Sequence, residues 1–271
     1  MPLAVCATPI GNLEDVTLRV LRELGEAQLV LCEDTRRTRG LLARHGVTAT
    51  LRSYHRHNEA ARTAELLPRL AAGERVALVS DAGLPGVNDP GARLIAAALD
   101  AGVPVTVLPG PSAVETALVA SGLVGERYQF LGYVPRGEAA LAALWAELAA
   151  WPHPAVAFES PERLPATLRS LAAAAPARPV AVCRELTKRF EEVVRGPAAD
   201  VAGRFAAAPK GEIALVVGAA PGSPAEVDAD ALAAVAELVG AGMPRKRAVA
   251  VVARLARTSR NTLYAKSLQS G

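Results

Sequence analysis

Residues 75–91 read Arg75-Val-Ala-Leu-Val-Ser-Asp-Ala-Gly-Leu-Pro-Gly-Val-Asn-Asp-Pro-Gly91, and the rest of the chain is organised around this stretch. Its apolar run, Val76–Val79, is typical of a buried strand. A loop with three glycines and two prolines follows from Ser80, and a helical pattern begins near Ala92. Because a plain strand-to-helix turn needs one or two turn residues rather than twelve, we interpret this loop as a ligand-binding loop, in which glycine lets a ligand approach the backbone closely.

The loop departs from two common nucleotide-binding signatures. Gly86 and Gly91 have the spacing of a P-loop, but Ala92 and Arg93 occupy the positions that need Lys and Ser or Thr. After the first predicted strand, residues 7–12 contain one glycine and a proline instead of Gly-x-Gly-x-x-Gly. An ATP site and a Rossmann dinucleotide site are therefore both disfavoured.

Apolar runs of strand length alternate with helical patterns on both sides of this stretch. In the first half the predicted strands are 3–7, 27–32, 76–79 and 103–108. Such alternation predicts an α/β fold, with a parallel sheet covered by helices on both faces. The second half repeats the alternation, with predicted strands at 130–134, 155–158, 180–183 and 212–217.

Two short stretches mark the predicted domain boundaries. Ser-Gly-Leu-Val-Gly at 121–125 is the predicted hinge, and Pro-Gly-Ser-Pro at 221–224 reads as a linker. A chain of 271 residues, 51% of them hydrophobic, is long enough for two compact domains. We predict an N-terminal α/β domain at 1–122, a second α/β domain at 123–222 and a basic helical C-terminal module at 223–271.

Composition limits the cellular environment and the kinds of site that we expect for this protein. There is no export signal and no uncharged apolar stretch of about 18 residues, so we expect a soluble cytoplasmic protein without a membrane partner. Cys6, Cys32 and Cys183 each lie in or at the end of an apolar run, which favours reduced core residues. His55 and His57 do not share a helix face, and no metal site is expected.

The end of the chain is basic. From 242 to 271 there are seven Lys or Arg residues and no acidic residue, a charge of +7, whereas the rest of the chain sums to −4. Charge alone leaves open a solvated helical face or a polyanion-binding surface. The helix-turn-helix pattern of this segment resembles a small nucleic-acid-binding module. Six of its seven basic residues are predicted to contact nucleic acid, and they are Arg245, Lys246, Arg247, Arg254, Arg257 and Arg260.

Polar residues follow several other predicted strands. The run 33–37, Glu-Asp-Thr-Arg-Arg, suits either an acid/base cluster or the first turn of a helix. Ser112 suits a helix cap or a ligand contact. Glu159 also ends a strand, and the charged stretch 184–192 suits either a solvated loop or the activation of a hydroxyl group.

Six motifs occur together in a characteristic order. They are Thr-Pro-Ile-Gly-Asn-Leu at 8–13, Glu-Asp-Thr-Arg at 33–36, Ser-Asp-Ala-Gly at 80–83 with Asn-Asp-Pro-Gly at 88–91, Pro-Gly-Pro-Ser-Ala at 109–113, Glu-Ser-Pro at 159–161 with Arg163, and Arg-Glu-Leu-Thr-Lys at 184–188. In this combination the whole chain resembles the bacterial 16S ribosomal RNA ribose 2′-O-methyltransferases of the tetrapyrrole methylase superfamily.

The resemblance implies a class III methyltransferase-like architecture of two α/β/α domains, with a cleft for S-adenosylmethionine between them and a small C-terminal helical module. It implies a homodimer that methylates a cytidine ribose in the decoding region of 16S ribosomal RNA within the 30S subunit. Carried over by position, the cofactor contacts are Pro9, Ser80, Asp81, Ala82, Gly83, Leu84, Ser112, Ala113, Glu159, Leu186 and Ala214.

The chain departs from the usual pattern of that family at a few positions. Leu84 stands where Thr is usual, Asn88 where Ser is usual and Phe158 where Tyr is usual. A hydroxyl lost at Phe158 removes one hydrogen bond, worth roughly 0.5 to 1.5 kcal/mol, which indicates altered tuning rather than lost function. The loop that begins at Pro135 is also less basic than usual, so it offers fewer RNA contacts.

For the reaction we hypothesise that Lys188 stabilises the ribose oxygen while Asp34 or Glu185 accepts its proton. The predicted RNA contacts are Arg36, Arg37 and Arg136, together with the basic residues of the C-terminal module. Two other interpretations remain open. One is a tetrapyrrole (precorrin-type) C-methyltransferase or another small-molecule methylase on the same fold, and the other is a non-catalytic RNA-binding or ribosome assembly factor.

Overall fold

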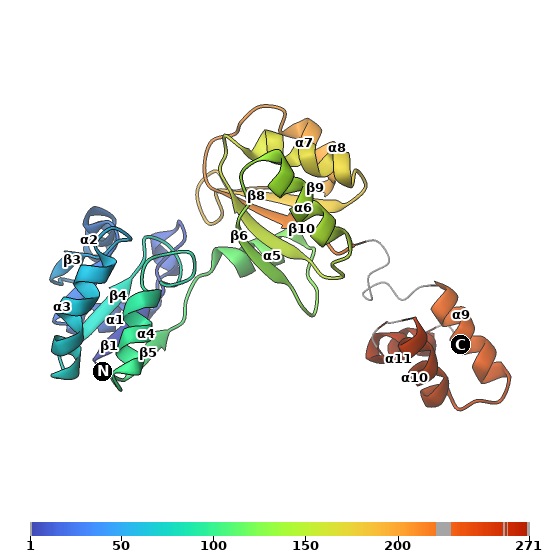
Figure 1. The fold of residues 1–271 in the computed structure, drawn as a ribbon, viewed down its shortest axis with the longest axis horizontal. Helices are drawn as coiled ribbons and strands as arrows, with labels where there is room; N and C mark the ends of the chain where they lie inside the picture. Colours follow the sequence, from blue (N-terminus) through green and yellow to red (C-terminus); the bar gives the residue numbers. More distant parts are fainter. Residues whose placement is uncertain (1, 221–228, 257, 259, 270–271) are drawn as a thin grey trace. The chain divides into compact units, whose positions relative to one another are not determined.

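The structure is a computed structural model that describes residues 2–220, 229–256, 258 and 260–269 (Figure 1). The chain divides into two compact units. The first comprises Met1–Thr116 together with Glu185–Glu191, and the second comprises Ala117–Arg184 together with Glu192–Gly271. The charged stretch 185–191 therefore belongs to the first unit although it lies far along the chain. The predicted domain boundaries stay a prediction, and the one at residue 222, with the linker 221–224, lies outside the described residues.

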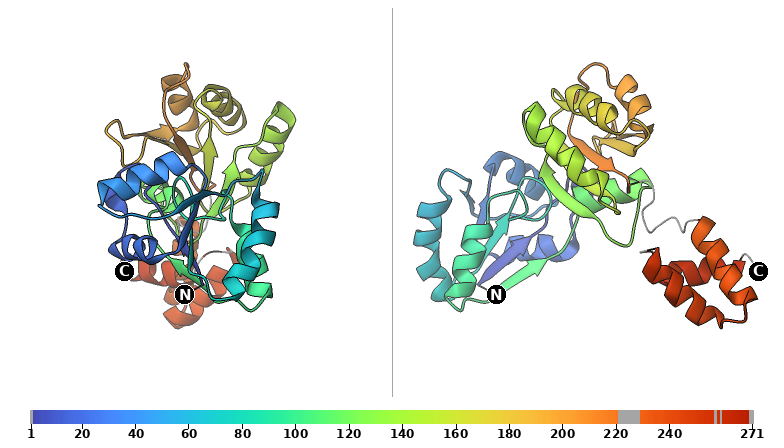
Figure 2. Two further views of the ribbon diagram at one scale, coloured as in Figure 1. Left: turned by 90° about the vertical axis from the view of Figure 1, so that its left-hand side faces the viewer. Right: turned by 45° about the vertical axis from the view of Figure 1, so that its right-hand side comes forward.

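The first unit contains a five-stranded parallel sheet of order β3-β2-β4-β1-β5. Its ribbon is coloured blue to green (Figures 1 and 2). Its strands are β1 (Leu3–Cys6), β2 (Leu29–Cys32), β3 (Leu51–Ser53), β4 (Val76–Val79) and β5 (Val105–Leu108). Its helices are α1 (Leu18–Glu26), α2 (Thr35–Arg44), α3 (Glu59–Ala71) and α4 (Ala92–Asp100), with a short 3-10 helix, η1 (Leu13–Asp15), and the start of α5 (Ala113–Ser121). The parallel sheet predicted for this half is confirmed.

Helices cover both faces of this sheet. Val20 of α1 and Leu41 of α2 pack with one set of strand residues, whereas Leu66 of α3 and Leu94 of α4 pack with the alternate set. Strands buried on both faces read as continuous apolar runs, as Val76–Val79 does. This double burial explains why the strand pattern stands out in the sequence.

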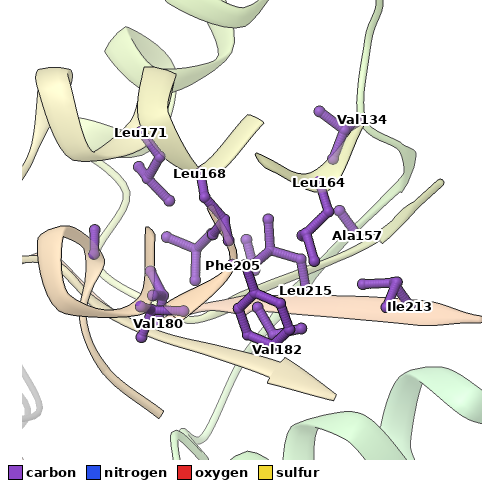
Figure 3. Close-up of a cluster of buried hydrophobic side chains, with 14 of the residues drawn as sticks. Val134, Ala157, Leu164, Leu168, Leu171, Val180, Val182, Phe205, Ile213 and Leu215 are labelled. Carbon is purple, nitrogen blue, oxygen red and sulfur yellow. The ribbon is translucent and has the colours of Figure 1, made fainter. Parts of the chain in front are cut away.

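The second unit contains a mixed sheet of order β6-β7-β10-β8-β9, in which only β6 and β7 are parallel. The strands are β6 (Gln129–Tyr133), β7 (Ala155–Glu159), β8 (Pro179–Arg184), β9 (Glu192–Pro197) and β10 (Ile213–Val217), and the helices are α6 (Glu138–Ala149), α7 (Leu164–Ala174) and α8 (Ala198–Arg204). The repeated alternation therefore does not produce a second parallel sheet, and β9 was not among the predicted strands. Leu164 and Leu168 of α7 pack on Val182 and Leu215 in the core (Figure 3).

The C-terminal helices are α9 (Ala229–Gly240), α10 (Arg245–Leu255) and α11 (Arg260–Gln269). They share a small apolar core that includes Val235, Val249 and Leu263. Pro244 directly precedes α10, where its fixed φ angle suits the start of a helix.

The three cysteines are buried and free, which confirms the prediction of reduced core residues. Burial raises the pKa of the Cys6 thiol to about 12 and also raises that of Cys32. Both thiols are therefore protonated and unreactive near neutral pH. Among the described helices, none is long and apolar enough to cross a membrane.

Candidate functional site

The predicted ligand loops of the first unit gather at one edge of its sheet. Because the five strands are parallel, the loops that follow β1, β2, β4 and β5 all leave at the carboxyl edge. This edge carries Pro9, Asp34, the segment 80–84 and the pair Ser112 and Ala113. The structure thus brings together the residues that the sequence places after separate strands.

The loops after β1 and β4 are joined by backbone hydrogen bonds. Thr8 and Gly83 each donate an N–H to the other's carbonyl, at 2.8 and 3.0 Å. The Thr8 hydroxyl donates to the Ser80 carbonyl at 3.0 Å, and the buried Ser80 hydroxyl donates within its own loop to Gly83 at 3.1 Å. Gly83 has a φ of 75°, a value that glycine adopts at no steric cost. The two loops therefore form one preorganised segment.

Asp81 and Asp34 link the loops after β4 and β2. The Asp34 N–H donates to Asp81 Oδ1 at 3.0 Å, and Arg37 lies 3.6 Å from Asp81. Asp34 caps α2 by accepting the Arg36 N–H and also accepts two hydrogen bonds from the Arg36 guanidinium, at 3.1 and 2.8 Å. These hydrogen bonds from Arg36 hold the pKa of Asp34 well below its usual range. A carboxylate of such low basicity accepts protons poorly.

Ser112 lies directly before α5. Its carbonyl accepts the Thr116 N–H at 3.0 Å, and its hydroxyl donates to Glu115. The Ser-x-x-Glu spacing is that of a capping box. Ser112 therefore stands at the N-terminus of α5, and its predicted side-chain cap and ligand contact both stay predictions.

The segment 185–191 forms a tight turn within the first unit. Glu185 and Thr187 have φ angles of 52° and 66°, left-handed values that are uncommon for residues with a side chain. Lys188 Nζ lies 2.8 Å from Glu185 Oε1, and the Thr187 N–H donates to Glu191 Oε2 at 2.6 Å. The turn presents the predicted catalytic pair Lys188 and Glu185 and leaves Leu186 only 8% exposed.

This turn contacts the loop after β1 at Gly11. The Asn12 N–H donates to Thr187 Oγ1 at 3.0 Å. A Cβ atom at Gly11 would lie 2.6 Å from Lys188 Cγ and 2.9 Å from the Leu186 carbonyl oxygen, too close for any side chain. Gly11, Asn12 and Thr187 belong to the quoted motifs, but the sequence analysis did not select them. Their role comes from a contact between segments 175 residues apart.

Asp89 is a second feature that the sequence analysis missed, although it lies in the Asn-Asp-Pro-Gly motif. Burial and the nearby charge of Glu33 raise the pKa of its carboxyl to about 6. The loop around it is anchored by Glu59, which accepts the Gly91 N–H at 3.0 Å. Perturbed carboxyl groups of this kind gather at functional sites.

In the second unit, Glu159 and Ala214 lie at one edge of the mixed sheet. Ala214 is near the start of β10, and it reaches the edge where β7 ends because these two strands are antiparallel, with Ala214 opposite Phe158. The buried Glu159 carboxylate accepts hydrogen bonds from the Ser160 N–H at 2.6 Å, Arg163 Nε at 2.7 Å and Thr167 Oγ1 at 2.5 Å. Its oxygens are thus already engaged by its own unit.

The predicted RNA-binding residues lie mostly at the surface. The Arg36 and Arg37 side chains are 85% and 64% exposed, and Arg136, Lys246, Arg247, Arg254 and Arg260 are exposed as well. Arg245 donates to the Ser267 carbonyl inside the C-terminal module. Arg257 lies outside the described residues. Within the described ranges, no group of three or more His, Cys, Asp or Glu side chains is placed to hold a metal ion.

Comparisons with known proteins give a consistent set of similarities. Residues 2–202 match the family model of the Tetrapyrrole (Corrin/Porphyrin) Methylases. The chain is 41% identical to a ribosomal RNA small subunit methyltransferase I of Mesorhizobium japonicum, covering 98% of this chain and 91% of the relative, and 47% identical to its counterpart in Mycobacterium bovis, covering 93% and 88%. A crystal structure of uroporphyrin-III C-methyltransferase from Thermus thermophilus with S-adenosylhomocysteine has the same fold, with a TM-score of 0.55, 21% identity and coverage of 80% and 96%.

Proposed function

The chain belongs to the tetrapyrrole (corrin/porphyrin) methylase family, and on that basis we propose that it is an S-adenosylmethionine-dependent ribosomal RNA methyltransferase. Its substrate in this proposal is the ribose 2′-hydroxyl of a cytidine in the decoding region of 16S ribosomal RNA. The observation that carries the proposal is the similarity to small-subunit RNA methyltransferases over nearly the whole chain, beyond the part that matches the family model.

The carboxyl edge of the first sheet suits this cofactor. S-adenosylmethionine supplies an activated methyl group on a sulfonium ion. In the first unit, Pro9, the segment 80–84, Ser112, Ala113 and Leu186 would hold it. Small side chains at Ala82 and Ala113 let a ligand approach the backbone closely, and the Thr8–Gly83 hydrogen bonds fix the loop that carries Ala82. In the second unit, Ala214 and the Glu159 backbone are the proposed contacts.

The residues of the 185–191 turn support a mechanism based on positioning and charge. Holding the ribose oxygen in line with the methyl group provides most of the acceleration in such a transfer. Lys188 would stabilise the oxygen as its negative charge develops, and Glu185, paired with Lys188, would accept the proton. Asp34 is the weaker choice of base because its pairing with Arg36 lowers its pKa.

Further parts of the proposal concern partners. Arg36, Arg37 and Arg136 would contact RNA phosphates, as would the exposed basic residues of α10 and α11. The enzyme would act as a homodimer on the 30S subunit in the cytoplasm.

A tetrapyrrole C-methyltransferase is the second candidate, because the fold is shared with such an enzyme. The basic C-terminal module argues against it, since a free tetrapyrrole needs no separate polyanion-binding helices. A non-catalytic assembly factor is the third candidate.

The deciding experiment is the transfer of a radiolabelled methyl group from S-adenosylmethionine to 30S subunits that lack the modification, followed by nuclease mapping. Label in a 2′-O-methylcytidine is the expected result. Cofactor binding without label in RNA would overturn the ribosomal proposal and favour a small-molecule acceptor. Failure to bind the cofactor would favour the assembly factor.

A further inference from the structure

Three aromatic rings gather at the end of β6 and β7 in the second unit, in a chain with only 4% aromatic residues. The ring of Phe158 contacts that of Phe130, with centroids 5.1 Å apart, and that of Tyr133, with centroids 5.7 Å apart. Both contacts are edge-to-face, a favourable arrangement for aromatic pairs. We call Phe130, Tyr133 and Phe158 the aromatic cluster.

A β-bulge is what brings these rings together. Residues three apart in a regular strand point to opposite faces of the sheet, so Phe130 and Tyr133 would be separated. The register between β6 and β7 shifts between these two residues, and Gly132 has a φ of 68°. The bulge turns Tyr133 onto Phe158, its cross-strand neighbour. Bulges often re-aim a side chain in this way next to a functional site.

The backbone after Tyr133 is held on both sides. The Val134 N–H donates to the Phe158 carbonyl at 2.9 Å, and the Val134 carbonyl accepts a hydrogen bond from Arg163 Nη2 at 2.6 Å. Arg163 is itself fixed by the buried carboxylate of Glu159. The cluster is therefore rigid before any ligand binds, which lowers the entropy cost of binding.

The cluster combines an exposed ring with a nearby cation. Tyr133 is 64% exposed, and Arg136, three residues further on, is also exposed. Throughout the described part of the chain, no acidic side chain forms an ion pair with Arg136. An exposed aromatic ring followed three residues later by an exposed cation suits a nucleic acid strand, whose bases stack and whose phosphates are anionic.

We propose that the aromatic cluster is a stacking platform for an unpaired base of the RNA substrate, with Tyr133 contacting the base and Arg136 the adjoining phosphate. The inference rests on the proposed function and extends it to a surface for base recognition. The cluster also lies beside Ala214, a proposed cofactor contact directly opposite Phe158. A base stacked there would be held close to the segment proposed to bind the cofactor.

The test compares Tyr133→Ala with Tyr133→Phe, and Leu99→Ala serves as the control because Leu99 is a similarly exposed apolar residue on α4. Binding to unmethylated 30S subunits is measured by filter binding at fixed salt. Loss of one stacking ring should weaken binding roughly 5- to 150-fold, whereas Tyr133→Phe and the control should bind like the unaltered protein. In Tyr133→Trp, stacking should also quench the new indole fluorescence when 30S subunits are added.

Three outcomes would overturn the platform. The first is that Tyr133→Ala binds 30S subunits like the unaltered protein. The second is that Tyr133→Ala selectively loses S-adenosylmethionine affinity in calorimetry, which would assign the ring to the cofactor. The third is that Tyr133→Ala changes its oligomeric state in sedimentation, which would assign the ring to a subunit contact. Methylation of 30S subunits by the unaltered protein distinguishes failure of the platform from failure of the proposed function. If it methylates 30S subunits while Tyr133→Ala binds them equally well, only the platform is refuted.

Discussion

The two sheets of this protein position their polar residues by different means. In the first unit every strand of the sheet is parallel, so the motifs after β1, β2, β4 and β5 reach the carboxyl edge simply by following a strand. In the second unit Ala214 reaches the equivalent edge from the start of β10, because antiparallel pairing places it opposite Phe158 and Cys183. Motif order along the chain is therefore a direct guide to the site in the first sheet, and an indirect one in the second.

The two units also stabilise their loops differently. The loops of the first unit are joined mainly through backbone groups and a close approach at Gly11. The edge of the second unit depends on one buried carboxylate, Glu159, which gathers donors from Ser160, Arg163 and Thr167. Substitutions should accordingly affect stability most in the second unit and catalysis most in the first.

The largest effect is expected for Glu159→Ala. It removes the ion-pair partner of Arg163 and the acceptor of the Thr167 hydroxyl, which should lower the free energy of unfolding by about 3 kcal/mol. Urea denaturation measures the change, and Glu162→Gln, an exposed neighbour, is the control. If Glu159→Ala lowered the free energy of unfolding no more than Glu162→Gln does, the edge of the second sheet would not depend on Glu159.

Gly11→Ala tests the first unit. The new methyl group would collide with Lys188 and with the Leu186 carbonyl, displacing the turn that carries the proposed catalytic pair. A displacement of about 1 Å should reduce methyl transfer roughly 100-fold. Gly40→Ala is the matched control, because no atom lies near its added Cβ and alanine favours the helix. Equal activity of the two variants would refute the positioning role of the Gly11 contact.

Thr187→Val tests the same contact between the 185–191 turn and the loop after β1 with a smaller change. It removes the acceptor of the Asn12 N–H while keeping a β-branched side chain, so the left-handed backbone strain at this position remains. We expect a 2- to 10-fold fall in kcat, with rescue by Thr187→Ser, since one hydrogen bond contributes roughly 0.5 to 1.5 kcal/mol. A purely structural role would instead lower Tm in both variants and leave kcat unchanged.

The smallest effect concerns pH. Asp89 has a folded pKa of about 6, above its ordinary value of 3.8, so the folded state binds its proton more tightly than the unfolded state. The resulting destabilisation is absent below about pH 4, grows as the pH rises and is complete above about pH 6. Asp89→Asn should be more stable than the unaltered protein by about 1 kcal/mol at pH 8, after allowance for solvent screening, and equally stable near pH 4. A constant difference in denaturation midpoint across this range would contradict the assignment.

From the sequence alone we could predict the α/β class, the strands of the first sheet other than β3 and the position of the glycine-rich loop after Val79, whose role in ligand binding stays a prediction. Strands buried on both faces leave continuous apolar runs, and the glycines and prolines that end them are equally local signals. The resemblance carried by the motifs added the family, which the comparisons confirm.

Only the tertiary structure decided which strands pair and in which direction. It placed β10 between β7 and β8, added β9, and brought the 185–191 turn against Gly11. It also raised the pKa of Asp89 by burying it near Glu33, and it used a bulge to gather the aromatic cluster. The physical reason is common to all of these features. A local pattern records how deeply a residue is buried, whereas pairing, close approach and electrostatic coupling depend on partners far away in the chain.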